Sequence, residues 1–179
     1  MPDVTAKHFD EMEAALGGVF VRVRAELGVG AFGLQVINLP AHFDEPYAAH
    51  AHEGTDYEPA NHRQEEVYVP LAGRATMVAG GERVELVPGM AVRVGAAQMR
   101  NFLTADEPFR MLAIGGVPGE PYRAPPFTEL GAGDRPPGRC WLRRGAAARR
   151  RWACASRARA ARRAPRAPAR RAAARRGAR

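Results

Sequence analysis

Short strand-like segments rich in apolar residues, punctuated by glycine and proline, follow one another along most of the first 115 positions of this chain, and the first of them, VFVRVR, alternates. The segments cover residues 19–24, 31–39, 66–71, 74–79, 82–87, 90–94, 99–103 and 109–115. A period of two is typical of a β-strand with one buried face. Turn signals such as Gly80-Gly81 and Pro88-Gly89 separate the segments at short intervals, which favours a β-sandwich or barrel.

A different spacing predicts one short helix near the N-terminus, from Thr5 to Leu16. Phe9, Met12 and Leu16 recur at intervals of three and four residues, which places them on one stripe of a helix. Thr5 can cap the first turn, and the following Gly17-Gly18 is expected to end the helix. We expect this helix to flank one end of the barrel.

The net charge of +8 conceals a division of the chain into two parts. Residues 1–132 contain 10 Lys or Arg against 18 Asp or Glu, a net charge of −8. Residues 133–179 contain 17 Arg against one acid, a net charge of +16. We assign residues 1–132 to one packed domain, since their length suffices for a core. No signal peptide and no membrane span is predicted, so we expect a cytoplasmic protein that does not associate with membranes.

The second part, residues 133–179, is rich in Arg, Ala, Pro and Gly and is predicted to be a disordered tail. Two interpretations of it stay open. Its charge can bind nucleic acid or another polyanion non-specifically through phosphate contacts. Alternatively, a GC-rich gene translated in a shifted frame would give the same residues, with arginine present and lysine absent. Both cysteines, Cys140 and Cys154, lie in this part, so the domain has no disulfide and no thiolate metal site.

The candidate chemistry lies between the second and third of these segments and at the first residue of the third. His50 and His52 are two residues apart, so on a strand both imidazoles lie on the same face. Glu66 opens the next segment, EVYVPLAG, and shares a face with Tyr68. Two imidazoles and one carboxylate can hold a divalent metal and leave positions open for a substrate. The alternative is a pair of surface histidines and a solvated strand edge.

These residues resemble the cupin superfamily of small jelly-roll barrels, in particular single-domain cupins with a QEEVYV segment. The first cupin motif is His-x-His, three or four residues, Glu, six residues and Gly. Glu66 and Gly73 match its second half, and His50 and His52 match the pair. Thirteen residues separate the pair from the glutamate. We expect these residues to loop out, because added loop length costs little closure entropy.

A competing register of the first motif makes His62 the second histidine, with Ala60 at the first position. That register loses one imidazole, so we prefer His50 and His52. Gln64, His62 and Tyr57 either line the mouth of the pocket or belong to the inserted loop.

The second cupin motif is altered in this chain. Its Pro, second Gly, His and Asn positions, counted from Gly89, are occupied by Gly95, Ala97, Arg100 and Thr104. The fourth ligand position is therefore an arginine, which stays protonated and cannot coordinate a cation. Three interpretations of Arg100 stay open. It is exposed or paired with an acid on a neighbouring strand, it points inward and fills the metal site by pairing with Glu66, or it lies beside a metal and binds a substrate carboxylate or phosphate with its planar fork.

The resemblance implies an all-β jelly-roll barrel that binds a small molecule, and it implies a homodimer, since cupins commonly dimerise. It also implies metal-dependent enzymes of the dioxygenase and isomerase types, alongside cupins that only bind or sense a ligand. We predict a divalent metal, Fe, Mn, Ni or Zn, held by His50, His52 and Glu66, with metal-free binding as the alternative. The residues expected to contact the small molecule are Arg100, Tyr68, Gln64 and His62. The sequence selects no reaction.

Overall fold

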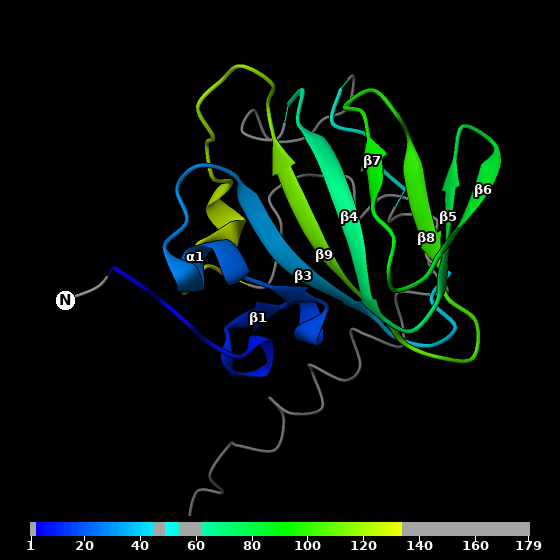
Figure 1. The fold of residues 1–179 in the computed structure, drawn as a ribbon, viewed down its shortest axis with the longest axis horizontal. Helices are drawn as coiled ribbons and strands as arrows, with labels where there is room; N and C mark the ends of the chain where they lie inside the picture. Colours follow the sequence, from blue (N-terminus) through cyan, green and yellow to red (C-terminus); the bar gives the residue numbers. More distant parts are fainter. Residues whose placement is uncertain (1–2, 45–48, 54–61, 134–179) are drawn as a thin grey trace, which may run out of the picture. The chain divides into compact units, whose positions relative to one another are not determined.

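Two antiparallel β-sheets form the domain in the computed structural model, which describes residues 3–44, 49–53 and 62–133 (Figure 1). The larger sheet has the order β1 (Ala14–Ala15), β2 (Phe20–Val21), β3 (Gly33–Leu39), β9 (Phe109–Gly116), β4 (Glu65–Ala72) and β7 (Val92–Val94). The smaller sheet has the order β6 (Glu82–Leu86), β5 (Ala75–Ala79) and β8 (Arg100–Leu103). Non-consecutive strands are neighbours in both sheets, as the jelly-roll prediction requires, and the all-β prediction is confirmed.

The hydrophobic core lies between the two sheets. Leu39 and Phe109 enter it from the larger sheet, and Met77, Leu86 and Phe102 enter it from the smaller one. Burying apolar surface from both sheets in one cluster is the main force that holds them together. The ring of Tyr68 on β4 packs edge-on against Phe102, with ring centroids 5.0 Å apart. Tyr68 therefore connects this hydrophobic core with the buried polar groups of the barrel.

The predicted helix from Thr5 to Leu16 is wrong. The segment contains a 3₁₀ turn, η1 (Phe9–Glu11), then strand β1, then a second turn, η2 (Leu16–Gly18). Its apolar residues do face the protein, because Met12 is buried in a second cluster on the outer face of the larger sheet, and Phe9 packs against that cluster. An irregular segment that follows the sheet therefore produced the spacing expected of a helix.

The one α-helix among the described residues is α1 (Val23–Leu27), where the alternation VFVRVR predicted a strand through Arg24. Strand β2 ends at Val21 instead. Arg22 and Arg24 are buried rather than solvent-facing, and both donate to residues near position 130. Among all the described residues, no helix is long and apolar enough to cross a membrane.

Arg22 connects residues 127–133 to the N-terminal part of the described chain. Its guanidinium donates to the carbonyl oxygens of Phe127 at 3.1 Å, Ala132 at 2.7 Å and Gly133 at 3.2 Å. It also pairs with Glu13, whose carboxylate accepts from the backbone N–H of residue 131. The segment that follows η5 (Pro126–Thr128) is thereby held against the β1–β2 region. The predicted tail lies outside the described residues from position 134 onward, and the division of the chain after residue 132 stays a prediction.

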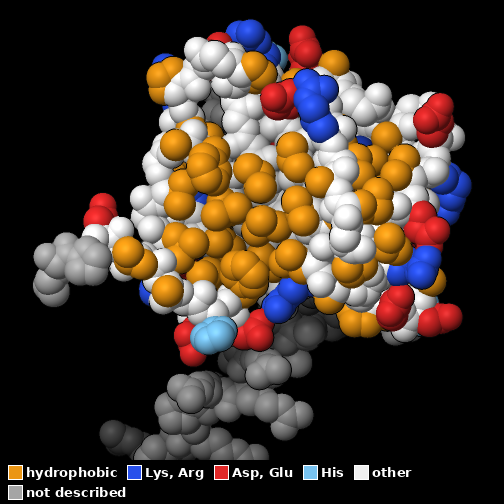
Figure 2. Space-filling model, viewed as in Figure 1, with side chains coloured by type: hydrophobic (Ala, Val, Ile, Leu, Met, Phe, Trp, Pro, Cys, Tyr) orange, Lys and Arg blue, Asp and Glu red, His pale blue; other side chains and the backbone are white. Residues whose placement is uncertain are grey.

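The outer face of the larger sheet is also apolar. Strand register places Leu34, Ile114 and Val67 in one row across β3, β9 and β4, and it places Leu112 and Val69 together in the next row. Hydrophobic side chains gather over these three strands in Figure 2. An antiparallel sheet with one solvated face normally alternates apolar and polar residues. This face, defined by Leu34, Val67, Val69, Leu112 and Ile114, is referred to below as the apolar sheet face.

Candidate functional site

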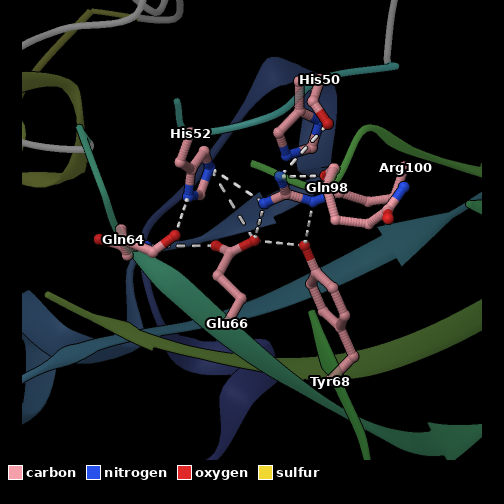
Figure 3. Close-up of polar contacts among 7 residues, drawn as sticks. All are labelled: His50, His52, Gln64, Glu66, Tyr68, Gln98 and Arg100. Atoms are coloured by element: carbon pink, nitrogen blue, oxygen red, sulfur yellow. Dashed lines mark hydrogen bonds and ion pairs between the residues drawn. The ribbon is translucent and has the colours of Figure 1, made fainter. Parts of the chain in front are cut away.

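Three segments meet at one end of the core and bring the candidate residues together (Figure 3). Strand β4 turns Glu66 and Tyr68 inward, since they are two residues apart. The segment of residues 49–53 runs antiparallel to the start of β8, where His50 and Arg100 exchange two backbone hydrogen bonds of 3.0 Å. The backbone N–H of His52 donates to Ala96 O at 2.7 Å. These bonds hold both histidines over the inward side chains of β4.

His50, His52 and Glu66 form a group with the composition of a metal site. Each offers one ligand atom, and these atoms all lie within 4.8 Å of one another. His52 Nε2 and Glu66 Oε2 are 4.0 Å apart. Two atoms bound to one zinc ion at roughly 2.0–2.2 Å lie no more than about 4.4 Å apart, so the donors match a metal in kind and nearly in spacing. His62 is exposed and is not part of this group in the described chain.

Arg100 occupies the centre of the group. Its side chain is 1% exposed, so the interpretation of Arg100 as an exposed residue is wrong. Nη2 donates to Glu66 Oε2 and lies 3.1 Å from His52 Nε2. Nε donates to the Tyr68 hydroxyl at 3.0 Å, and Nη1 donates to His50 O at 3.2 Å. The ion pair with Glu66 is present, and each guanidinium nitrogen has a partner within the protein.

Burial and charge set the protonation of these groups. Burial lowers the pKa of His52, which favours the neutral imidazole. Its Nδ1 lies 3.1 Å from Gln64 O, a carbonyl oxygen that can only accept, so Nδ1–H is the donor. The unprotonated Nε2 therefore faces Arg100. Burial raises the pKa of Glu66, but the neighbouring His52 imidazole and the positive charge of Arg100 outweigh burial and hold this pKa below its ordinary value. Burial and the Glu66 charge raise the pKa of Tyr68 well above its ordinary value. The phenol therefore stays protonated and donates to Glu66 Oε2.

Gln64 extends this network by one residue. Its side-chain Nε2 donates to Glu66 Oε1 at 3.3 Å. The carboxylate can only accept, so this contact fixes which end of the amide is the donor. Gln64 Oε1 is then left buried without a hydrogen-bond partner in the described chain. Gln64 is 6% exposed.

Gly115 on β9 makes room for the Gln64 side chain, and the sequence analysis missed its role. It pairs in register with Glu66, and a Cβ at this position would lie 2.2 Å from Gln64 Nε2. A glycine within a strand often marks such a close approach, and this was the available signal. Gln98 was also missed, and its carbonyl oxygen lies 3.5 Å from Arg100 Nη1. Of the residues predicted to contact a ligand, Arg100, Tyr68 and Gln64 are brought together and His62 is exposed. Tyr57, considered for the mouth of the pocket, lies outside the described residues.

A cleft of about 660 Å³ opens at the same end of the interior. Two of its lining residues are strand partners of the polar centre, because Val94 pairs with Glu66 and Ala79 pairs with Arg100. Paired residues of antiparallel strands point to the same side of a sheet. The cleft and the polar centre therefore face the same interior space. The apolar part of the lining is Met77, Ala79, Val84, Val94, Ala96 and Ala97, and the polar part is Glu53, Glu82, Arg93 and Gln98.

Two facing antiparallel sheets in which non-consecutive strands are neighbours place the chain in the class of jelly-roll barrels. No protein-family model matches the sequence, and no curated protein sequence matches it. Among solved structures, the polyketide cyclase RemF from Streptomyces resistomycificus is 17% identical over 62% of this chain and 78% of that chain, with a TM-score of 0.50. A likeness at this identity concerns the fold alone. The chain has the cupin fold, and the predicted resemblance is confirmed at that level.

Two further solved structures match with TM-scores of 0.48. A cupin protein from Bacteroides fragilis is 24% identical and covers 66% of this chain and 92% of its own. A sugar phosphate isomerase of the cupin superfamily from Silicibacter pomeroyi is 17% identical and covers 68% of this chain and 77% of its own.

Proposed function

We propose that this chain binds a small molecule inside its barrel, at the end where Gln64, Glu66 and Arg100 meet. The observation that carries the proposal is the unpartnered oxygen of the buried Gln64 amide. A buried acceptor without a donor costs about 1–3 kcal/mol. A ligand that brings a hydroxyl or N–H group to Gln64 Oε1 recovers this energy. We therefore propose a ligand that carries at least one such donor.

The adjoining cleft supports the same proposal. Its volume of about 660 Å³ falls within the range of roughly 300–1,000 Å³ that is usual for small-molecule sites. Met77, Val84 and Val94 give it an apolar lining, against which the carbon skeleton of a ligand can pack. The lining residue Val94 is the strand partner of Glu66, so a ligand with one polar end and an apolar body fits both the cleft and the polar centre.

A second candidate function is metal-dependent catalysis, and the compact donor group His50, His52 and Glu66 favours it. Bound Fe, Mn, Ni or Zn would supply a Lewis acid or a centre for oxygen activation, as in dioxygenase- or isomerase-type chemistry. Arg100 Nη2 contacts both His52 Nε2 and Glu66 Oε2, so these two atoms become available only if the guanidinium moves. The geometry therefore favours metal-free binding over this second function.

The homodimer is retained as a proposal, supported by the apolar sheet face. The charged pairs Glu65–Arg93 and Asp10–Arg110 lie next to this face. Each joins opposite charges, so a second copy would meet an apolar surface whose bordering charges are already neutralised. Polyanion binding by the basic tail concerns residues outside those described, and it stays a prediction, as does the cytoplasmic location.

A thermal-shift screen of the full chain tests the proposed function. The panel contains polyols, hydroxy acids and amines, each with a matched analogue that lacks the donor group. We expect at least one donor-bearing compound to raise the melting temperature of the wild type and of the His62→Ala control, and to have little effect on Gln64→Leu. A compound that stabilises Gln64→Leu as much as the wild type, or a panel in which the analogues act equally, would contradict binding at Gln64.

A further inference from the structure

We propose that the guanidinium of Arg100 takes the place of the metal ion in this cupin fold and is the resident cation of the site. The proposal rests on the atoms that Arg100 contacts. His52 Nδ1 faces Gln64 O, so Nε2 is the ring nitrogen that faces the interior and the one that a metal would bind. Arg100 Nη2 lies 3.1 Å from this Nε2 and donates to Glu66 Oε2. One nitrogen thus occupies the position between the two donor atoms.

The other nitrogens of the guanidinium hold it there. Nε donates to the Tyr68 hydroxyl at 3.0 Å, and Nη1 donates to His50 O at 3.2 Å. A metal ion can reach its donors only if Arg100 leaves, and leaving breaks these bonds together with the ion pair to Glu66. An arginine does not lose its proton in proteins, so it cannot yield the site by becoming neutral. A divalent ion beside the remaining positive charge would also be repelled.

The guanidinium also connects the same segments that a metal would connect. It joins β4 through Glu66 and Tyr68, the segment of residues 49–53 through His50 and His52, and β8 through its own backbone. In this arrangement, His50 and His52 hold the guanidinium of Arg100 and do not bind a metal ion. The proposal deepens the proposed function, because it assigns the charge that the ligand meets inside the barrel.

Metal binding by matched variants of the full chain, made without a histidine tag, tests the proposal. Arg100→His places an imidazole where the guanidinium lies and adds a fourth donor to His50, His52 and Glu66. Each protein is incubated with Zn²⁺ or Co²⁺ and desalted, and its metal content is measured by elemental mass spectrometry. We expect less than about 0.1 metal per chain in the wild type and about one in Arg100→His. The Arg100→His metal should disappear when His50 and His52 are also changed to alanine.

Two controls define the readout. Arg93→His adds a histidine at an exposed position of β7 and should bind no more metal than the wild type. Circular dichroism reports whether each variant is folded, and the Co²⁺ absorption spectrum reports whether imidazole nitrogen is bound. If Arg100→His does not fold, the metal contents of the wild type and of Arg100→Gln are compared instead. Glutamine is neutral and too short to reach both donor atoms, so Arg100→Gln should bind more metal than the wild type, and equal metal contents would contradict the proposal.

Near-stoichiometric metal in the wild type that is lost in the His50→Ala/His52→Ala variant would overturn the proposal. A folded Arg100→His that takes up no metal would overturn it as well, because Arg100 would then not be what excludes the ion. The proposed function fails separately. Its readout is the ligand-induced melting shift and its dependence on Gln64, and neither involves metal content.

Discussion

Arg100 and Glu66 depend on each other for their stability inside the barrel. The Arg100 side chain is 1% exposed and that of Glu66 is 12% exposed, so neither charge is compensated by bulk water. Removing one member of a buried ion pair costs more than the pair itself contributes, because the other charge is left buried. Tyr68 shares this dependence, since its hydroxyl donates to Glu66 and accepts from Arg100.

Neutralising Glu66 should destabilise the domain strongly. We expect Glu66→Gln to lower the free energy of unfolding by about 3–5 kcal/mol, because Arg100 keeps its buried charge without a counter-ion. The measurement is urea denaturation followed by circular dichroism. Glu65→Gln is the matched control, since Glu65 pairs with Arg93 at the surface and such pairs contribute about 0–1 kcal/mol. Equal losses in the two variants would show that the Glu66–Arg100 pair is not energetically distinct.

Gly73, the last residue of the first cupin motif, has a measurable steric role at the end of β4. Its φ is +72°, and a Cβ would lie 2.0 Å from Pro108 O. Gly89 also has a positive φ, +96°, but a Cβ there would have no atom within 4 Å. The left-handed conformation costs a non-glycine residue about 1–2 kcal/mol. Gly89→Ala should lose about this much unfolding free energy, and Gly73→Ala should lose clearly more. Equal values would exclude the backbone clash.

Among the elements, the strands were predictable because each is a short apolar-rich segment bounded by turn signals. The predicted segments that became β3 to β9 differ from the observed strands at their ends only. The N-terminal region was predicted wrongly for a physical reason. Met12 packs on the outer face of the sheet, and Arg22 is buried by contacts with residues more than 100 positions away. Tertiary contacts of this kind leave no periodic signal in the local sequence.

The grouping of His50, His52 and Glu66 was predictable from the sequence, but the arrangement of the residues around them was not. The cupin motif predicted that His50, His52 and Glu66 lie together despite the thirteen residues between the pair and the glutamate, and their ligand atoms do lie within 4.8 Å of one another. The orientation of Arg100 could not be chosen from the sequence, since it depends on the backbone pairing of His50 with β8. Gly115 and Gln98 act through their position beside Gln64 and Arg100. Only the fold reveals these neighbours.

The contact of Arg22 with the chain end gives a prediction at this scale. We expect Arg22→Gln to loosen the segment after η5, because the carbonyl oxygens of Phe127 and Ala132 lose a charged donor. The unfolding free energy should fall by about 1–3 kcal/mol, the range for buried acceptors left without a partner. Hydrogen exchange should accelerate at the amide of residue 131 while the amides of β4 and β9 change little. Uniform acceleration throughout the domain would contradict a local role.

For the whole molecule, the apolar sheet face and the polar interior act on opposite sides of the same larger sheet. The interior is proposed to bind the ligand, and the outer face is proposed to bind a second copy. Residues of both rows lie on β9 and β4, the two strands that also carry Gly115 and Glu66. Self-association would therefore bury the back of the sheet that presents the candidate site.

Sedimentation of the full chain checks the dimer proposal. We expect the wild type to sediment as a dimer at micromolar concentration, and Val69→Lys to shift it to the monomer by placing an unpaired charge in the apolar sheet face. Met99→Lys is the control, since Met99 is a large exposed hydrophobic residue before β8, in the other sheet. A wild type that remains monomeric at high concentration would refute the dimer, and an equal effect of both variants would place the interface elsewhere.

The central claim is that a guanidinium, and not a metal ion, lies between His52 and Glu66. A crystal structure of the wild-type chain grown with excess Zn²⁺, with anomalous diffraction data collected at the zinc edge, tests it most directly. We expect density for the Arg100 side chain in contact with Glu66 Oε2 and His52 Nε2, and no anomalous peak at that position. A peak at roughly 2.0–2.2 Å from His50, His52 and Glu66, with Arg100 turned away, would contradict it.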